Sequence, residues 1–266
     1  MKLDGCNALV TGASAGIGRE FARQLAGRAR LIVLVARRQE RLEELRNELL
    51  QRNPKLTVHI QTIDLTDSDQ LNQLREFPEK HGITIDLLIN NAGLGDIGPF
   101  ATSDPPRIEE MLYVNTLALT SLTRRMLPGM LHQKRGAILN VSSSAGFMPI
   151  PGFSVYAATK AYVTSFSEGL RAELRGTGVN VCALCPGPVH TEFSQVAQRA
   201  GQQPEKGPKI IYVAAADVAR AGLKAVEHDR ALVIPGAAMK VAMAIVRLMP
   251  LVLLRLGSSL SAKRTA

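Results

Sequence analysis

The chain has no tryptophan and few other aromatic residues: four tyrosines and seven phenylalanines make up 4% of its 266 residues. Proteins that bind single-stranded nucleic acids combine basic residues with exposed aromatic side chains. The scarcity of aromatics therefore argues against a nucleic-acid partner. The five histidines lie far apart and form no H-x-x-x-H pair, so the sequence predicts no metal site.

Cysteine is also scarce, and the three present cannot form a disulfide framework. Cys182 and Cys185 form a C-x-x-C pair on a predicted buried strand, without a second pair, which indicates core residues rather than a zinc or redox site. Residues 1–7 lack a secretion signal, and no charge-free apolar run reaches the ~18 residues that span a bilayer. These absences predict a cytoplasmic protein.

The composition is that of a globular protein, with 46% apolar and 21% charged residues. Apolar runs of strand length alternate with segments of helical periodicity from end to end. The predicted strands are residues 6–11, 31–36, 56–63, 85–90, 137–142, 179–184 and 232–234, and the predicted helices are 19–26, 38–50, 68–81, 107–132, 156–175 and 217–226. The alternation predicts a single doubly wound Rossmann-type α/β domain over residues 1–236, with parallel strands and helices on both faces.

One connection is unusually long, because no clear element is predicted between Pro186 and Ala214. Long connections of this kind usually form lids or binding loops. Ligands of doubly wound folds bind beyond the carboxyl ends of the strands. Since this segment follows a strand, residues 187–214 are expected to cover the substrate.

The formal net charge of +9 is unevenly distributed. Residues 230–266 contain no acidic residue and six basic ones, Arg230, Lys240, Arg247, Arg255, Lys263 and Arg264. Residues 237–249 predict an apolar helix, ended by Pro250, on which two of these cations share one stripe. A helix with so much apolar surface must bury that surface against protein or lipid. The extension, residues 237–266, forms either a lid or a subunit interface, or its residues 237–256 contact a membrane surface peripherally.

A glycine-rich turn joins the first strand to the first helix. Its sequence from Thr11 to Gly18 is T-G-A-S-A-G-I-G, with the spacing G-x3-G-x-G. Glycines permit a tight turn and a close backbone approach, and the N-terminus of the following helix attracts a pyrophosphate. The residues expected to bind a dinucleotide here are Gly12, Ser14, Ala15, Gly16, Ile17 and Gly18.

The end of the second strand indicates which dinucleotide is bound. NAD enzymes usually carry an acidic residue there that bonds the ribose 2′-hydroxyl, but this strand ends in Arg37 and Arg38. The planar guanidinium group suits a phosphate. A cation at the start of a helix opposes the helix dipole, which argues against the alternative that both arginines are ordinary surface charges of the helix. The pair therefore predicts NADP(H), with Arg37 contributing most of the selectivity.

Tyr156 and Lys160 are four residues apart on a predicted helix and therefore share a face. A phenol with a pKa of about 10 must lose about three units to act as an acid or base near neutrality. An ammonium about 4 Å away supplies energy of that order, so Lys160 is expected to lower the pKa of Tyr156. Ser143, at the carboxyl end of a strand, would polarise a substrate carbonyl.

Together with Asn90-Asn91-Ala92-Gly93, Asn115 and Pro186-Gly187, these motifs resemble the short-chain dehydrogenase/reductase family over residues 6–234. The resemblance implies a seven-stranded parallel sheet and a homodimer or homotetramer. It implies catalytic roles for Ser143, Tyr156 and Lys160, with Asn115 holding a proton-relay water. Tyr156 and Lys160 would also bind the cofactor, Lys160 at the nicotinamide ribose. The further cofactor residues that it implies are Asp64 and Leu65 at the adenine, Asn91, Ala92 and Gly93 at the adenosine ribose, and Pro186, Gly187, Val189 and Thr191, with Thr191 at the carboxamide.

These observations predict an oxidoreductase that reduces a ketone or aldehyde with NADPH, with Tyr156 as general acid. The expected pocket wall is apolar and suits a hydrophobic substrate; it comprises Leu94, Phe147, Met148, Ile150, Phe153 and Phe193. Two alternatives are a non-catalytic NADPH-binding sensor and a membrane-surface scaffold on the same fold. The presence of the phenol, ammonium and hydroxyl together disfavours the sensor, since binding alone does not need them.

Overall fold

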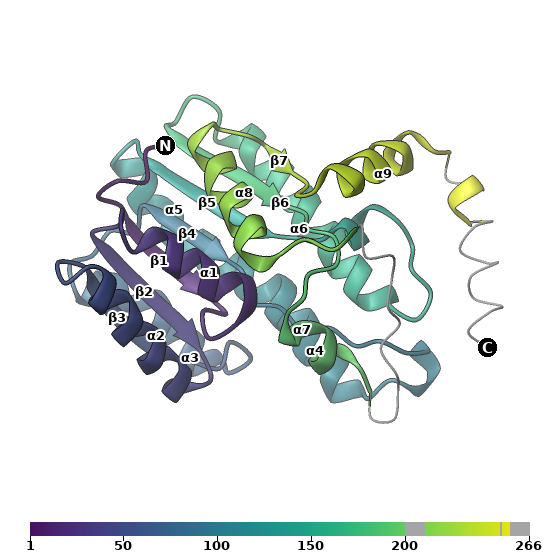
Figure 1. Ribbon diagram of the computed structural model, residues 1–266, viewed down its shortest axis with the longest axis horizontal. Coiled ribbons are helices and arrows are strands. Elements are labelled where there is room, and N and C mark those ends of the chain that lie inside the picture. The colour runs from purple at the N-terminus through teal and green to yellow at the C-terminus, as the bar shows by residue number, and fades with distance from the viewer. Residues whose placement is uncertain (200–210, 251, 256–266) are drawn as a thin grey trace.

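The computed structural model describes residues 1–199, 211–250 and 252–255. Its centre is a seven-stranded sheet in which every neighbouring pair of strands is parallel. Helices cover both faces of this sheet (Figure 1). The predicted doubly wound fold with seven parallel strands is confirmed.

The strands form where the sequence is apolar on both sides of the pleat. They are β1 (Asn7–Thr11), β2 (Leu31–Ala36), β3 (Thr57–Thr62), β4 (Leu87–Asn90), β5 (Gly136–Val141), β6 (Val179–Leu184) and β7 (Leu232–Val233), in the order β3-β2-β1-β4-β5-β6-β7. β1, β4 and β5 are buried at every position, as expected for strands covered on both faces. β3, at the edge, is half-buried or exposed along its length.

Two helical layers enclose the sheet. One contains α1 (Gly16–Leu25), α2 (Gln39–Arg52) and α8 (Ala215–Glu227), and the other contains α3 (Ser68–Lys80), α5 (Leu119–His132) and α6 (Ser154–Glu173). Each helix buries residues at helical spacing, as α2 does with Leu42, Leu45 and Leu49. The sheet has its topological switch point between β1 and β4, where α/β folds bind ligands beyond the carboxyl ends of the strands.

The helix predicted over residues 107–132 is interrupted. It consists of α4 (Pro105–Leu112), the π-helical segment η2 (Tyr113–Ala118) and α5. The side chain of Asn115, in η2, donates to the carbonyl oxygen of Leu94 and accepts from its backbone N–H. Isolated π-helical turns occur mostly at functional sites, and this one holds a predicted site residue against the loop after β4.

The connection predicted to lack an element contains the short helix α7 (Glu192–Ala197), so that prediction is wrong for this part. The backbone N–H of Ile97 donates to the carbonyl of Ala197 at 2.8 Å, and Ile97 pairs with Gln198 in a parallel bridge. α7 is thereby joined to the loop after β4, which also contains η1 (Phe100–Thr102). Residues 200–210 of the predicted lid lie outside the described residues.

The predicted C-terminal helix is present as α9 (Ala237–Leu248), and a further helical turn spans residues 252–255 (Figure 1). Met249 has an extended backbone before Pro250, as steric clash with a proline ring requires. α9 rests against η3 (Ser144–Phe147), where the Arg247 guanidinium carbon lies 5.5 Å from the centroid of the Phe147 ring, and Met239 and Met243 of α9 are buried. Of the helices that the structure describes, none combines the length and apolar character of a membrane span. Residues 256–266 lie outside the described residues.

Candidate active site

A cavity of about 630 Å³ opens where the segments after β1, β4, β5 and β6 meet. Most of the predicted site residues line it. They are Gly12, Ser14, Ala15, Gly16, Ile17, Arg37, Arg38, Asp64, Leu65, Asn91, Ala92, Gly93, Ser143, Tyr156, Lys160, Pro186, Gly187, Val189 and Thr191. Gly18 and Asn115 are absent from the wall of the cavity.

The glycine-rich turn fits its predicted role. Gly12 has φ +67°, and a Cβ there would lie 2.8 Å from Asn91 Nδ2, so only glycine leaves this surface open. α1 begins with no side-chain cap at Ala15 and no acidic residue in its first turn, which leaves unpaired N–H groups and positive potential for an anion. Gly18 does not line the cavity, and its contact with the cofactor stays a prediction. A Cβ there would lie 2.2 Å from the Gly12 carbonyl oxygen, so glycine at this position allows helix and turn to pack closely.

Two guanidinium groups border the cavity after β2. Arg38 donates to Ser14 Oγ at 3.2 Å, which ties it to the glycine-rich turn, and to Glu192 of α7 at 2.9 Å. Arg37 is 57% exposed and lies 3.7 Å from a carboxylate oxygen of Asp64. Planar guanidinium groups at this place, one of them bonded to Ser14, suit a phosphate group.

The hydroxyl, phenol and ammonium predicted to act together come from adjoining elements. Tyr156 and Lys160 lie one turn apart on α6, and the Lys160 Nζ atom is 5.6 Å from the centroid of the Tyr156 ring. That ammonium donates to the Val141 carbonyl at 2.9 Å. Ser143 follows β5, and its hydroxyl accepts from the Ala145 N–H at 3.1 Å. The three groups share one wall of the cavity.

Burial dominates the acid–base properties of this wall. Desolvation raises the pKa of Tyr156 to about 12, and a hydrogen bond with Ser143 opposes this rise. Desolvation also lowers the pKa of the Lys160 ammonium to about 8. The net shift in the pKa of Tyr156 is upward because the phenol is desolvated and its ring packs against Phe153 at 4.2 Å and Phe193 at 5.4 Å. That Lys160 stabilises the phenolate stays a prediction.

Asn115 lies outside the wall of the cavity and supports the site through hydrogen bonds. Besides its bonds to Leu94, its Nδ2 donates to Thr159 Oγ1 on α6 at 3.0 Å. A Cβ on Gly93 would lie 3.3 Å both from Asn115 Oδ1 and from Lys160 Nζ, so these three residues converge closely. The amide is fully engaged by protein groups, and it therefore positions the loop after β4 against α6.

The apolar part of the wall follows the prediction except at one residue. Leu94, Met148, Ile150, Phe153 and Phe193 line the cavity, and Ile97, Val196 and Tyr212 extend this surface. Phe147 does not line it: its ring lies 5.5 Å from the Arg247 guanidinium carbon of α9. The sequence could not separate Phe147 from Met148, because the side-chain directions within η3 depend on the docking of α9.

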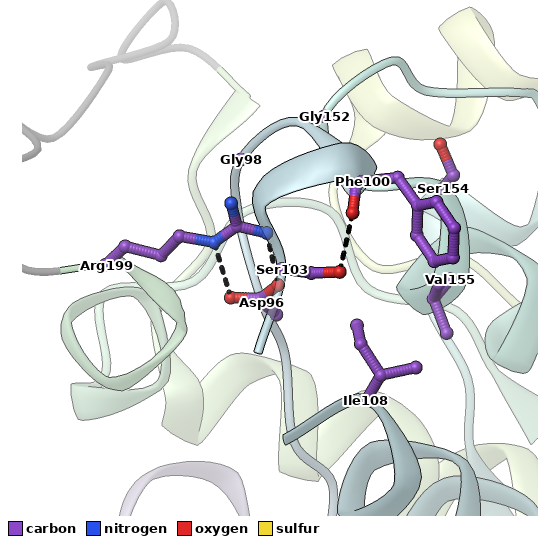
Figure 2. A pocket seen from close by; sticks show the side chains of 9 residues that line it. All are labelled: Asp96, Gly98, Phe100, Ser103, Ile108, Gly152, Ser154, Val155 and Arg199. Atoms are coloured by element: carbon purple, nitrogen blue, oxygen red, sulfur yellow. Dashed lines mark hydrogen bonds and ion pairs between the residues drawn. The ribbon is translucent and has the colours of Figure 1, made fainter. Parts of the chain in front are cut away.

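Sequence reasoning missed an ionic cluster beside the apolar wall. Asp96 is buried and accepts from Arg199 at 3.0 Å and 2.6 Å, and Arg107 lies 3.7 Å from it. Figure 2 shows Arg199 reaching across to Asp96 next to a small hollow bordered by Phe100, Ile108 and Val155. Arg107 also donates to the carbonyls of Gly95 and Val196. The cluster fixes α7 to the loop after β4.

The described residues fit a nicotinamide dinucleotide. The glycine turn, the uncapped start of α1 and the cations after β2 suit a pyrophosphate and a ribose phosphate. The cavity volume lies in the range of cofactor sites. Fold and site together define a Rossmann-type dinucleotide-binding protein.

Comparison with known proteins agrees with this class. Residues 6–202 match the short chain dehydrogenase family. The very-long-chain 3-oxoacyl-CoA reductase of Bos taurus is 35% identical over 203 residues, which are 74% of this chain and 64% of that protein. The chain therefore matches less than two thirds of that relative's length.

Two solved structures carry different cofactors. A short-chain dehydrogenase from Sphingobium yanoikuyae in complex with NADPH has a TM-score of 0.79 at 33% identity, covering 91% of this chain and 94% of that chain. A short-chain dehydrogenase/reductase from Burkholderia phymatum in complex with NAD has a TM-score of 0.79 at 26% identity, covering 92% and 93%. The chain belongs to the short-chain dehydrogenase/reductase family.

Proposed function

We propose that the protein is a reductase that uses NADPH to convert a hydrophobic ketone or aldehyde into an alcohol. The observation that carries this proposal is the convergence of the Ser143 hydroxyl, the Tyr156 phenol and the Lys160 ammonium in a cavity that also contains two guanidinium groups. Binding alone does not require this combination, which argues against a non-catalytic sensor. Each group has a distinct task in reduction.

When bound, the cofactor supplies the hydride. Ser143 donates a hydrogen bond to the substrate carbonyl oxygen and thereby polarises it. Tyr156 donates its proton to that oxygen as negative charge develops. With a pKa of about 12 the phenol is fully protonated near neutral pH, as a proton donor must be. Lys160 stabilises the phenolate that remains.

Asn115 contributes to this scheme by positioning the backbone of η2 rather than through its side-chain amide binding a water. Its side-chain amide is occupied by Leu94 and Thr159, so a relay water would need another acceptor. We assign that role to a carbonyl of η2, because a π-helical turn departs from the regular bonding of an α-helix. The buried amide then keeps η2, Gly93 and Lys160 in register.

The choice of NADPH rests on Arg37 and Arg38. Neither is accompanied by an acidic residue at the end of β2, and Ser14 adds a hydroxyl donor beside Arg38. Solved members of the family bind NADPH or NAD, so the fold itself does not decide between them. Three buried free cysteines and dependence on NADPH favour a cytoplasmic enzyme.

The substrate region is apolar, which favours a carbonyl compound with a hydrophobic body. Phe153, Phe193 and Val196 form part of it, and the related bovine enzyme is named for very-long-chain 3-oxoacyl-CoA. The described part of the predicted lid contains α7, which contributes two of these side chains, Phe193 and Val196.

We propose that a second copy of the chain packs against the outer face of η2 and α6 and so forms a homo-oligomer. Leu117 is 59% exposed and Tyr162 is 42% exposed, and Tyr162 shares a 2.8 Å hydrogen bond with Thr120 of α5. Apolar groups on adjoining helices suit a second copy of this chain. Sedimentation of the purified chain tests this, and a monomer at all concentrations would contradict it.

A panel of carbonyl compounds, followed through NADPH absorbance, tests the proposed reaction. Turnover is expected for ketones or aldehydes with long alkyl or multi-ring bodies, and slower turnover for short polar ones. NADPH binding measured by calorimetry serves as the control for a folded site. Tight binding without turnover on any carbonyl or alcohol would favour the sensor.

A further inference from the structure

Glu192 occupies an unexpected place for an acidic residue, next to Arg38, one of the two arginines assigned to the 2′-phosphate. It is the first residue of α7, and its two carboxylate oxygens accept from Arg38 at 2.9 Å and from Arg41 at 2.5 Å. These contacts join positions more than 150 apart in the sequence. The same Arg38 guanidinium also donates to Ser14 of the glycine-rich turn. A single guanidinium therefore connects the cofactor turn to α7.

We propose that Glu192 competes with the cofactor's 2′-phosphate for Arg38 and Arg41, so that arrival of the phosphate releases α7 from the cofactor side. This inference rests on the proposed use of NADPH. A carboxylate and a phosphate can each accept two parallel hydrogen bonds from a planar guanidinium group, and the two anions repel each other at the same cations. The internal carboxylate acts as a stand-in for the ligand.

The charge balance of the cluster supports competition rather than sharing. Three cations, Arg37, Arg38 and Arg41, face two carboxylates, Glu192 and Asp64. One positive charge is left, whereas a phosphate monoester carries about two negative charges at neutral pH. Departure of Glu192 restores the balance. The two arginines also hold the pKa of the Glu192 carboxyl below its usual range, so it stays charged.

Release of Glu192 has a consequence on the substrate side, because α7 is short. Phe193, the next residue, lies 5.4 Å from the Tyr156 ring, and Val196 lines the apolar wall. At its other end α7 remains fixed by Arg107 and the Ile97 bridge. The 2′-phosphate is thereby coupled to the wall that contacts the substrate, and the coupling is reciprocal.

The test compares two ligands that differ only in the 2′-phosphate. Binding of 2′,5′-ADP and of 5′-AMP is measured by calorimetry for wild type and Glu192→Gln. Removing the competing carboxylate should tighten 2′,5′-ADP about fivefold, the value of one partly exposed ion pair, and leave 5′-AMP unchanged. Asp217→Asn, which removes an exposed carboxylate paired with Arg220 on α8, should change neither ligand.

The outcomes separate this inference from the proposed function. If wild type does not prefer 2′,5′-ADP to 5′-AMP, both fail. If wild type prefers it but Glu192→Gln binds it equally or more weakly than wild type does, Glu192 positions the arginines and the competition is refuted. Hydrogen exchange gives an independent readout: 2′,5′-ADP, unlike 5′-AMP, should speed exchange of residues 192–197 in wild type. Unchanged exchange would refute the release of α7.

Discussion

Tyr156 is the residue at which chemistry and binding can be separated. Replacing it with phenylalanine removes one oxygen and keeps the ring that packs against Phe153 and Phe193. The proton donor is lost, while the surfaces that bind NADPH remain. Turnover of Tyr156→Phe is expected to fall at least about a thousandfold, in the range of general acid catalysis, with the Kd for NADPH within a few-fold of wild type. Activity within tenfold of wild type would remove Tyr156 from the proposed role.

Arg37 provides a test of cofactor selectivity. In Arg37→Asp, a carboxylate replaces a guanidinium that lies 3.7 Å from Asp64, so a 2′-phosphate is repelled and a 2′-hydroxyl gains an acceptor. Loss of a charge-assisted hydrogen bond corresponds to roughly 10- to 100-fold. The ratio of kcat/KM for NADPH to that for NADH should fall by at least this factor. A wild-type enzyme that uses both cofactors equally would contradict the premise.

The lowered pKa of Lys160 predicts that the free energy of unfolding depends on pH. Its pKa is about 8 in the folded chain against 10.5 in the unfolded one, so the unfolded state binds more protons between these values and wild-type stability rises with pH across this window. Lys160→Met has no such charge to bury. Its stability relative to wild type should therefore decline by up to about 3 kcal/mol between pH 7 and 10.5.

Urea unfolding of both proteins at several pH values measures this change. Lys2→Met, which alters a lysine near the exposed N-terminus, controls for the general effect of removing a cation. A difference between Lys160→Met and wild type that stays constant with pH would contradict the lowered pKa.

At the residue scale, sequence spacing predicted which side chains line the cavity but not how they behave. Tyr156 and Lys160 fall on one face because helical geometry fixes that relation. The direction of the Tyr156 pKa depends on rings brought in from Phe153 and Phe193, which no local pattern encodes. The partner of Arg38 was equally unpredictable, since Glu192 arrives on a helix that the sequence did not indicate.

At the scale of helices and strands, some elements were likewise predictable from the sequence and others were not. The strands were predictable because continuous apolar runs leave few alternatives for a sheet buried on both faces. The π-helical turn was not, since it depends on the bonds of Asn115 to Leu94 and Thr159. α7 is only six residues long and is held by tertiary contacts, so its own periodicity gives no signal.

The anchoring of α7 predicts a separation of binding from chemistry. Asp96→Asn weakens two charge-assisted bonds to Arg199, at a cost of about 2 kcal/mol in the free energy of unfolding. α7 with Phe193 and Val196 would then be less well held against the substrate. We expect a severalfold rise in KM for the carbonyl substrate and little change in kcat or in NADPH affinity. Steady-state kinetics beside Asp217→Asn as control decides this; a fall in kcat alone would place Asp96 in the chemistry instead.

On the scale of the whole molecule, the outer face of α9 is an exposed apolar surface that the proposed reaction does not use. Met239 and Met243 are buried against the body, while Val241, Ile245 and Leu248 are 61%, 57% and 86% exposed. If α9 closed over the substrate cavity as a lid, these exposed side chains would be buried. The side of α9 that is buried is the one that carries the two methionines. The sequence from 230 to 266 adds six cations and no acidic residue. Like charges on two such tails disfavour pairing of copies through α9, whereas an anionic lipid surface attracts them.

We therefore expect full-length protein to float with anionic liposomes at low salt and to be released as salt rises. The double variant Ile245→Glu with Leu248→Glu should stay in the soluble fraction, since it places two carboxylates in the lipid-facing stripe. Leu117→Glu, at an equally exposed position on η2, should still float, which distinguishes a local face from general hydrophobicity. Wild type that never floats would refute membrane contact. If the double variant instead dissociated a stable dimer, α9 would be a subunit interface, and the apolar face would serve a second copy of the chain.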